Sequence, residues 1–372
     1  MVGAGPYGMA VAARALERAI ETVVVGRQMS FWKENMPDGM FLRSGPDWHL
    51  DASGVATFEA FLEERGIQAD EVDPVPIGVF LDYAGWFQAQ KGVAVRECLV
   101  TRLQARDGRF VASLDDGTEL AADRVVAAPG NGYFRQVPDW AAALQANAGA
   151  HTCDLVRFDD LAGARVLIVG GRQSAYEWAA LLGDNGAERV DIVHRHGVPR
   201  FERVSWKFVD EYMDATMSRR GWWRTLSQGE QDAISRRFWE VGRLTLEWWL
   251  TPRLQGDMFR MRPGTQVIEV SSHDDGTNTV TLSDGDRLTV DRLVFATGYR
   301  TDLPLVPYLR DLIDEIHQAH GFPILDEAFQ SSVPGLYFPG FASTRDFGPF
   351  FAFTKACPAA ASLIVDDILN AG

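Results

Sequence analysis

The chain alternates between short apolar runs, which are typical of buried strands, and longer segments with helical character. Met9–Ala19 is rich in Ala and Leu and lacks internal Gly or Pro, so it predicts a helix, and Val23–Val25 predicts a short buried strand. A second apolar run, Arg165–Val169, predicts another buried strand, followed by a helix through about Leu182 and a strand at Val190–Val193. Strands that alternate with helices indicate an α/β fold with parallel sheets.

Towards the carboxyl terminus, residues 335–341 predict a strand and residues 357–369 predict a helix. Residues 204–254 have a different pattern, with helical segments at 233–237 and 238–246. We interpret residues 204–254 as a helical insertion packed on the sheet; a cap over an apolar substrate cavity and a membrane or partner surface are the alternatives. This insertion holds six of the eleven tryptophans: Trp206, Trp222, Trp223, Trp239, Trp248 and Trp249.

An internal repeat links the two halves of the chain. The segment that begins Leu114-Asp115-Asp116-Gly117 recurs as Leu282-Ser283-Asp284-Gly285, with an offset of 168 residues (114 to 282). Each Asp-Gly pair predicts a type I′ hairpin turn, and each hairpin leads into a short apolar strand. The repeat therefore predicts two duplicated units.

The amino terminus carries a glycine turn, G-x-G-x-x-G, formed by Gly3, Gly5 and Gly8. In a dinucleotide-binding turn the first glycine makes the tight bend, the second lets the backbone approach a diphosphate, and the third lets the helix pack on the strand. The phosphates then lie at the helix amino terminus, where free N–H groups favour anions. The turn indicates a nucleotide site; a plain strand–helix turn is the alternative.

This first turn departs from the usual pattern in two ways. Only Met1 and Val2 precede Gly3, although a strand usually takes about 5 residues. We expect the true start to lie upstream, and loss of most of the first strand is the alternative. The acidic residue expected at the end of the second strand is replaced by Gly26-Arg27, which makes Arg27 a candidate contact for ribose, adenine or phosphate.

A second glycine turn lies at the same relative place in the second unit. Gly170 and Ala175 fill the first and third positions of the motif, and Arg172 fills the second. The backbone of Arg172 or its guanidinium is a candidate phosphate contact. The following strand ends in basic residues, so Arg195 favours NADP over NAD by pairing with the 2′-phosphate; a solvated charge is the alternative.

Length and charge narrow the class of protein. At about 150 residues per domain, 372 residues suggest two domains. A net charge of −15 argues against nucleic-acid partners and anionic membrane surfaces. We find no apolar run long enough to span a membrane and no signal peptide, so we expect a cytoplasmic protein.

The side chains that carry other chemistries are sparse. The three cysteines, Cys98, Cys153 and Cys357, form no C-x-x-C motif, which excludes a dithiol redox pair and predicts free thiols. The seven histidines show no metal-ligand spacing, so no metal is expected. A G-x-S-x-G motif is also missing, which argues against a serine hydrolase.

With Phe295-Ala296-Thr297-Gly298-Tyr299 closing the second unit, the two turns resemble those of flavoproteins with two dinucleotide-binding domains. Within that group the sequence is most similar to flavin-containing monooxygenases and lysine/ornithine N-hydroxylases. The resemblance implies two Rossmann-like α/β domains, each with a β-hairpin crossover, plus the Trp-rich helical insertion. It implies an FAD-binding domain at residues 1–152 and 293–372, and an NADP-binding domain at 153–292 that carries the insertion.

The resemblance also implies which residues hold the cofactors. For FAD, these are Gly3, Gly5, Pro6, Tyr7, Gly8, Trp32, Leu42, Arg43, Ser44, Ala128, Pro129, Gly130, Gly340 and Phe341. Thr297 and Gly298 are further cofactor-binding candidates, in the Ala-Thr-Gly segment that links the two domains. For NADP, these are Gly170, Gly171, Gln173, Ser174 and Ala175, with Arg195 near the 2′-phosphate. The helix at 357–369 is expected to direct its amino terminus at the flavin, where it stabilises negative charge.

Two departures from the family concern the reaction. The usual Gly-Asp at the carboxyl-terminal strand end is Gly340-Phe341, and the F-x-G-x-x-x-H signature is not met before His151. The second departure argues against a simple assignment to the Baeyer–Villiger branch or the classical amine-oxidising branch. His49 is a candidate proton shuttle and Arg345 a candidate anchor for a substrate anion or NADP; a packed histidine and a surface turn are the alternatives.

The resemblance implies an NADPH-dependent FAD monooxygenase that oxygenates an amine nitrogen or a sulfur of a small molecule through a flavin C4a-hydroperoxide. The expected cofactors are FAD and NADPH, and the expected partners are the small-molecule substrate and O₂. The first alternative is a flavin-dependent NADPH oxidoreductase without oxygenation. The second is a flavin-free NADP-binding sensor. The sequence leaves a homo-oligomer open.

Overall fold

The first glycine turn leads directly into helix α1 (Pro6–Glu17), which begins with a proline at its first position. Residues before the turn complete a parallel sheet, because Val2 bridges both Val25 and Ala127. The amide of Val2 donates to the carbonyl of Val126 at 2.8 Å, and the amide of Gly3 donates to the carbonyl of Val25 at 2.8 Å. A few residues therefore supply the central strand position of the first sheet.

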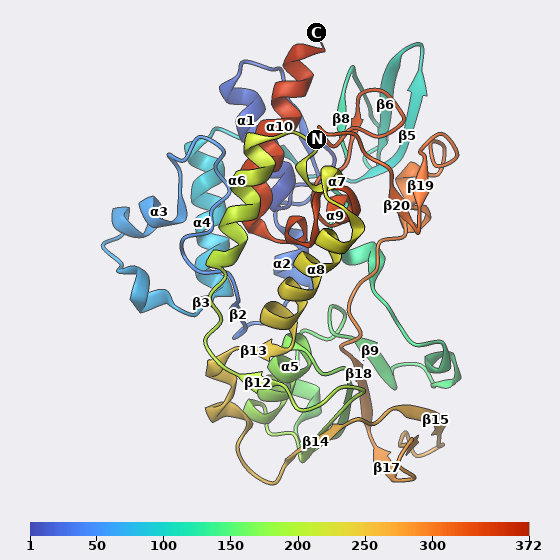
Figure 1. Cartoon of the computed structure of the whole chain (residues 1–372). Coiled ribbons are helices and arrows are strands. Elements are labelled where there is room, and N and C mark those ends of the chain that lie inside the picture. Colours follow the sequence, from blue (N-terminus) through green and yellow to red (C-terminus); the bar gives the residue numbers. More distant parts are fainter. Residues whose placement is uncertain (372) are drawn as a thin grey trace.

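The computed structural model describes residues 1–371, and their strands form two parallel sheets with the same order (Figure 1). In the first sheet the order is β4 (Val95–Arg96), β1 (Val24–Val25), Val2, β8 (Val125–Val126) and β21 (Leu336–Tyr337). In the second sheet it is β14 (Phe259–Pro263), β11 (Arg189–His194), β10 (Arg165–Val169), β18 (Arg292–Phe295) and β9 (Gly149–His151). The shared order confirms the predicted fold of two Rossmann-like units.

Each unit carries a three-stranded antiparallel sheet. These sheets are β5 (Val100–Arg106), β6 (Arg109–Leu114) and β7 (Glu119–Ala122), and β15 (Val267–Ser272), β16 (Asn278–Leu282) and β17 (Arg287–Val290). The prediction of type I′ turns is wrong, because Gly117 has φ +82° whereas Asp116 does not adopt a positive φ. The amide of Leu114 donates to the carbonyl of Thr118 at 2.9 Å, so the loop has three residues and needs one left-handed glycine.

The other α-helices and the short strand pairs surround the two sheets. Helices in the first half are α2 (Ser30–Glu34), α3 (Phe58–Glu64), α4 (Ile77–Gln90) and α5 (Gln173–Asp184). Helices in the second half are α6 (Asp210–Ser218), α7 (Trp222–Thr225), α8 (Gln228–Arg243), α9 (Thr344–Phe347) and α10 (Cys357–Asn370). The remaining strand pairs are β2 (Phe41–Leu42) with β3 (Val75–Pro76), β12 (Arg200–Phe201) with β13 (Thr245–Leu246), and β19 (Gln318–Ala319) with β20 (Phe322–Pro323).

The helices of the Trp-rich insertion pack mainly on the first unit, so the prediction that the insertion packs on the sheet is wrong. Trp206, Tyr212 and Phe238 belong to the apolar core of the first unit, and α6 packs against α10. Only the end of the insertion, with Trp249 and Leu250, joins the core of the second unit. Helix α8 runs without a break through both predicted helical segments as far as Arg243, whereas Thr245 and Leu246, predicted as helical, form strand β13. The helix points from the first unit towards α5 (Figure 1).

Strands β9 and β18 both pair within the second sheet. Strand β9 lies outside the range 153–292 predicted for the NADP-binding domain, and β18 begins at the last residue of that range. The division into domains at these residues stays a prediction, and we propose to extend the second unit by these two strands. Within residues 1–371, the helices are too short or too polar to cross a lipid bilayer.

Candidate functional site

The three glycines of the first turn have different surroundings. A Cβ at Gly3 would overlap the carbonyl of Ala128, and a Cβ at Gly8 would overlap the carbonyl of Gly3. Gly5, by contrast, has no atom within 4 Å of the place where its Cβ would lie. Two glycines are therefore needed for packing, whereas Gly5 faces open space at the amino terminus of α1. This is where the backbone would approach a phosphate group.

Tyr7 connects the first turn to the carboxyl-terminal loop. Its hydroxyl donates to the carbonyls of Phe351 (2.5 Å) and Phe353 (2.8 Å). Burial raises the pKa of Tyr7 well above its ordinary value, so the phenol stays neutral. Gly340 has φ +80°, and a Cβ there would lie 3.1 Å from the Tyr7 ring. The structure thus brings the predicted residues Tyr7 and Gly340 together beside the amino-terminal end of α10.

Four more predicted FAD residues lie at or next to the same turn. The amide of Ala128 donates to the carbonyl of Val2 at 2.8 Å, which holds Ala128 against Gly3. Pro129 and Gly130 follow; Gly130 adopts φ +69°, and no atom lies within 4 Å of the place where its Cβ would lie. Pro6 is the first residue of α1.

The other predicted flavin contacts are more dispersed. Arg27 is exposed and pairs with Glu34 at 3.1 Å, so its charge is already compensated. Trp32 is half-buried and packs against Phe80, with ring centroids 4.8 Å apart. Leu42 is buried in β2, and Ser44 is half-buried two residues later.

Arg43 reaches across to the second unit. Its Nε donates to Glu247 Oε1 at 2.8 Å, its Nη2 donates to the carbonyl of Thr245 at 3.0 Å, and its Nη1 donates to the carbonyl of Gly242. Glu247 is buried, and burial raises the pKa of its carboxyl against the opposing effect of Arg43. Arg43 therefore joins the first unit to the end of α8, a role that the sequence did not indicate.

The second glycine turn is built by the same packing rules as the first. A Cβ at Gly170 would overlap the carbonyl of Ala296, and a Cβ at Gly171 would overlap the ring of His194. Ala175 is buried in α5 and Ser174 is exposed at its first turn. The Gln173 side chain links neighbouring segments instead: it accepts from the amide of Glu247 at 3.1 Å and donates to Glu177 at 2.9 Å.

Arg172 and Arg195 lie on one side of this turn. The guanidinium carbon of Arg172 lies 5.1 Å from the centre of the Trp239 ring on α8. Burial lowers the pKa of Arg172, and the nearby charge of the exposed Arg195 lowers it further. Arg172 and Arg195 thus concentrate positive charge at this turn, and their contact with a phosphorylated dinucleotide stays a prediction.

The predicted Ala-Thr-Gly segment lies where the chain crosses between the units. The Thr297 hydroxyl donates to the carbonyl of Gln136, and the amide of Gln136 donates to the carbonyl of Gly298 at 2.9 Å. His151, on the second crossing, lies 3.2 Å from the Gly298 carbonyl through Nε2 and 3.1 Å from Cys153 Sγ through Nδ1. Burial lowers the pKa of His151 and raises that of Cys153, so both are neutral near pH 7.

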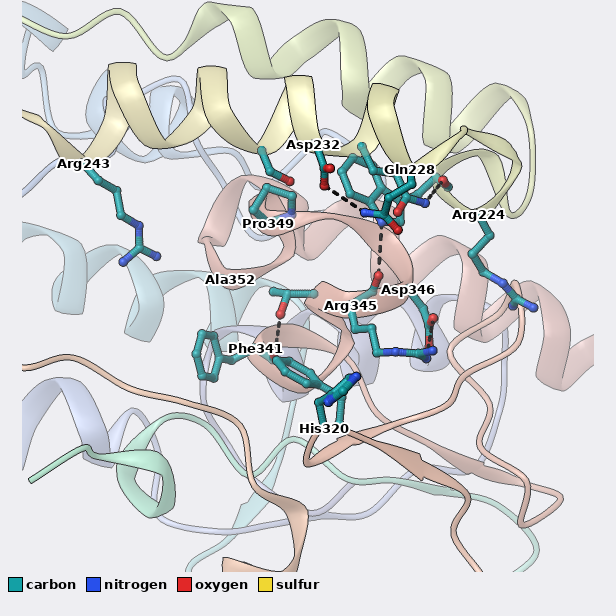
Figure 2. Close-up of a pocket in the computed structure, with 15 residues that line it drawn as sticks. Arg224, Gln228, Asp232, Arg243, His320, Phe341, Arg345, Asp346, Pro349 and Ala352 are labelled. Atoms are coloured by element: carbon teal, nitrogen blue, oxygen red, sulfur yellow. Dashed lines mark hydrogen bonds and ion pairs between the residues drawn. The ribbon is translucent and has the colours of Figure 1, made fainter. Parts of the chain in front are cut away.

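An open pocket of about 760 Å³ lies beneath α8 (Figure 2). Trp223, Phe322, Phe341 and Ala352 give it apolar surface. Its polar lining comes from α8 and from the loops on either side: Arg224, Gln228, Gln231, Asp232, Ser235, Arg243, His320, Thr344, Arg345 and Asp346. The volume and the mixed lining suit a small-molecule ligand. Helix α8 of the insertion does border this pocket, but most of the residues that line it are polar, so the alternative of a cap over an apolar substrate cavity stays a prediction.

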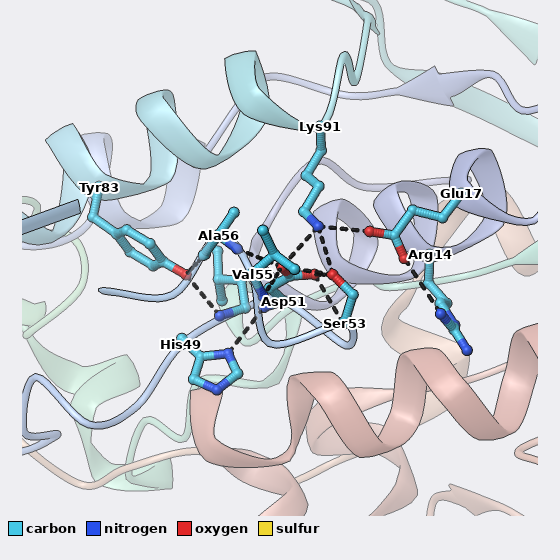
Figure 3. Close-up of polar contacts among 10 residues, drawn as sticks. Arg14, Glu17, His49, Asp51, Ser53, Val55, Ala56, Tyr83 and Lys91 are labelled. Carbon is cyan, nitrogen blue, oxygen red and sulfur yellow. Dashed lines mark hydrogen bonds and ion pairs between the residues drawn. The ribbon is translucent and has the colours of Figure 1, made fainter. Parts of the chain in front are cut away.

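The structure separates the two candidate catalytic side chains. Arg345 lines the pocket and pairs with the buried Asp346, with Nη1 2.9 Å from Oδ1. His49 does not line the pocket; its Nδ1 accepts from the amide of Asp51 at 3.2 Å, and burial lowers its pKa (Figure 3). Arg345 therefore remains a candidate substrate contact, and a proton-shuttle role for His49 stays a prediction.

Comparisons with known proteins identify the family. The chain matches the family described as pyridine nucleotide-disulphide oxidoreductase over residues 1–207, more than half of its length. It is 35% identical over 157 residues to an FAD-dependent urate hydroxylase of Xanthomonas campestris; the match covers 40% of this chain and 33% of the hydroxylase. The chain thus spans about a third of the length of that relative. It is also 26% identical over 343 residues to indole-3-pyruvate monooxygenase YUCCA1 of Oryza sativa, covering 84% of this chain and 79% of that protein.

The solved structure of ornithine N-hydroxylase from Kutzneria, determined with reduced FAD, NADP⁺ and L-ornithine, is similar in fold. The TM-score is 0.81 at 18% identity, and the alignment covers 100% of this chain and 98% of the hydroxylase. The fold likeness confirms the predicted architecture, and the matches together confirm the resemblance to flavin monooxygenases and N-hydroxylases. The chain therefore belongs to the pyridine nucleotide-disulphide oxidoreductase family.

Proposed function

We propose that the protein is an NADPH-dependent FAD monooxygenase that oxygenates a nucleophilic nitrogen or sulfur of a small molecule. The observation that carries the proposal is the combination of two glycine turns and one pocket. The two turns are built by the same packing rules, and the pocket is lined by Phe341, which follows Gly340 beside the first turn, and by residues of α8. Bound FAD supplies the redox and oxygen chemistry, with NADPH as the electron source.

The protein's own groups bind and orient the two cofactors. In the first unit, the backbone at Gly5 and the amino terminus of α1 hold a diphosphate, and neutral Tyr7 fixes the loop before α10. The amino terminus of α10 favours negative charge on the bound flavin. In the second unit, the backbone around Arg172 and the amino terminus of α5 hold the NADP diphosphate, while Arg195 pairs with the 2′-phosphate.

The thiols support oxygenation over disulfide reduction. Cys98, Cys153 and Cys357 are free and lie in separate surroundings. Cys357 lies at the start of α10, but burial raises the pKa of its thiol well above the ordinary value, which disfavours the reactive thiolate. The second candidate is a reductase that passes electrons to an acceptor without oxygenation. The match of this chain to the pyridine nucleotide-disulphide oxidoreductase family favours this candidate.

The decisive experiment separates these candidates on the purified protein. The visible flavin absorption band is recorded, and NADPH is added without oxygen; we expect the band to bleach. Oxygen labelled with a heavy isotope is then admitted with a panel of amines and thioethers. Label in the product establishes oxygenation, whereas bleaching followed only by hydrogen peroxide with every substrate supports the reductase. A protein that takes up no flavin overturns both and favours the NADP-binding sensor.

A further inference from the structure

The end of α8 carries a positive charge that the described chain does not compensate. Arg243 occupies the last turn of α8 and lines one end of the pocket. Burial lowers its pKa to about 10, with further lowering by Arg172 and Arg43, and no carboxylate acts in the opposite direction. Arg43 has Glu247 as its partner at 2.8 Å. Arg243 and Arg172 are therefore two neighbouring guanidiniums without a carboxylate partner in the described chain.

Helix geometry explains why these two groups meet. Trp239 and Arg243 are one turn apart on α8 and share a face. Arg172, at the residue before α5, stacks on Trp239 with 5.1 Å between its guanidinium carbon and the ring centre. The contact between the amide of Glu247 and Gln173 holds the segment after α8 against the start of α5. The arrangement thus places Arg243 beside the second glycine turn.

Two half-buried cations side by side are costly unless an anion joins them. Glu240, three residues before Arg243 on α8, is exposed, and within the described chain it forms no ion pair with Arg243. Asp232, the acidic residue of α8 that lines the pocket, is eleven residues earlier, which is about 16 Å along a helix. Figure 2 shows Arg243 at one end of α8, with Asp232 and Gln228 towards the other end. The site therefore suits an anion with more than one charge that also meets the amino terminus of α5.

We propose that Arg243 and Arg172 clamp the diphosphate of the nicotinamide dinucleotide between α8 and α5. This inference rests on the proposed function and adds a residue of the Trp-rich insertion to the dinucleotide site. It also gives α8 a second role, because Gln228, Gln231 and Asp232 on the same helix line the pocket. Binding of the dinucleotide would thus fix the helix that covers the substrate.

The test uses the FAD-loaded protein and the variant Arg243→Met, with calorimetric titration of NADP⁺ and, separately, NAD⁺. Loss of a charge-assisted hydrogen bond predicts about 10- to 100-fold weaker binding of both dinucleotides. Arg236→Met is the matched control, because Arg236 lies on the same helix but is exposed, and it should change binding by less than about twofold. Arg172→Met should weaken both dinucleotides as Arg243→Met does, and Arg243→Lys should restore part of the affinity.

The outcomes are distinguishable. Weaker binding of NADP⁺ alone would assign Arg243 to the 2′-phosphate and overturn the diphosphate clamp. Unchanged binding of both, with only the substrate KM raised, would assign Arg243 to a substrate anion and also overturn it. Wild-type protein that binds FAD but no dinucleotide would refute the proposed function itself. Hydrogen exchange gives an independent readout: NADP⁺ should protect residues 228–243 in the wild type and not in Arg243→Met.

Discussion

At the scale of single residues, the glycines of the first turn separate cofactor binding from folding. The change Gly5→Ala adds a methyl group where no atom lies within 4 Å, at a residue with φ −82° that any side chain tolerates. We expect the free energy of unfolding of the flavin-free protein to change by less than about 1 kcal/mol. FAD content, measured by absorbance of the purified protein, should fall sharply, because the methyl group occupies the space for the diphosphate.

Gly8→Ala is the matched comparison. Its methyl group would overlap the Gly3 carbonyl, so the helix and strand must separate. We expect destabilisation of the flavin-free protein by more than about 2 kcal/mol, measured by urea denaturation. Equal loss of stability in both variants would contradict the assignment of Gly5 to the cofactor.

Asp51 is a buried carboxylate that organises the loop after His49 (Figure 3). Burial raises its pKa, but hydrogen bonds from Lys91, Ala56 and Ser53 outweigh that effect and lower the pKa from 3.8 to about 2. Because the folded-state pKa is below the unfolded value, the stabilisation is complete above about pH 4 and is lost as the pH falls towards 2.

Asp51→Asn should therefore destabilise the protein by roughly 1–3 kcal/mol at pH 7 and flatten the pH dependence of unfolding below pH 4. Urea denaturation at several pH values measures both effects. The control is Asp82→Asn, since Asp82 is exposed on α4. A variant as stable as the wild type at pH 7 would show that Asp51 does not organise the loop.

At the scale of elements, α8 depends on its first turn. Ser227 caps the helix: its hydroxyl accepts from the amide of Glu230 at 3.3 Å, and the Glu230 carboxylate accepts from the amide of Ser227 at 2.7 Å. The sequence pattern predicted two shorter helices, the first of which begins at residue 233, so a cap at Ser227 was not predicted. The helix matters for the proposed function because it carries five residues that line the pocket: Gln228, Gln231, Asp232, Ser235 and Arg243.

Ser227→Ala should cost about 1 kcal/mol of helix stability and raise hydrogen exchange across residues 228–243. FAD content should stay unchanged, because the first turn is remote from this cap. Ser218→Ala, at the exposed end of α6, is the control and should leave exchange in α8 as in the wild type. Unchanged exchange in Ser227→Ala would show that α8 is held by packing alone.

At the scale of the whole molecule, the two units are joined by polar contacts between residues far apart in sequence. Arg43 and Glu247 are separated by 204 positions, and their side chains are largely buried. In a double-mutant cycle with Arg43→Met and Glu247→Met, we expect a coupling of about 1–3 kcal/mol in the free energy of unfolding.

The pair Arg109–Asp123 provides the comparison, because it has a similar distance of 2.7 Å but both side chains are exposed. Its coupling should stay below about 1 kcal/mol, since water screens the two charges. A coupling for Arg43–Glu247 as small as that of the exposed pair would show that this contact does not join the units.

Local patterns in the sequence were sufficient to predict the architecture. Glycine spacing, apolar strands and the repeated Asp-Gly hairpins depend on neighbouring residues, so both nucleotide turns and the duplication could be predicted from residues such as Gly3 and Gly170. Only the tertiary structure decided the partner of Arg43, the packing of the Trp-rich insertion on the first unit, and the meeting of Arg172 with Arg243. These features arise from contacts across about 70 to 200 residues, and such contacts leave no periodic signal along the chain. The glycine turns of the candidate site therefore depend on short sequence motifs. The pocket depends on tertiary structure, because it forms where α8 packs against the rest of the chain.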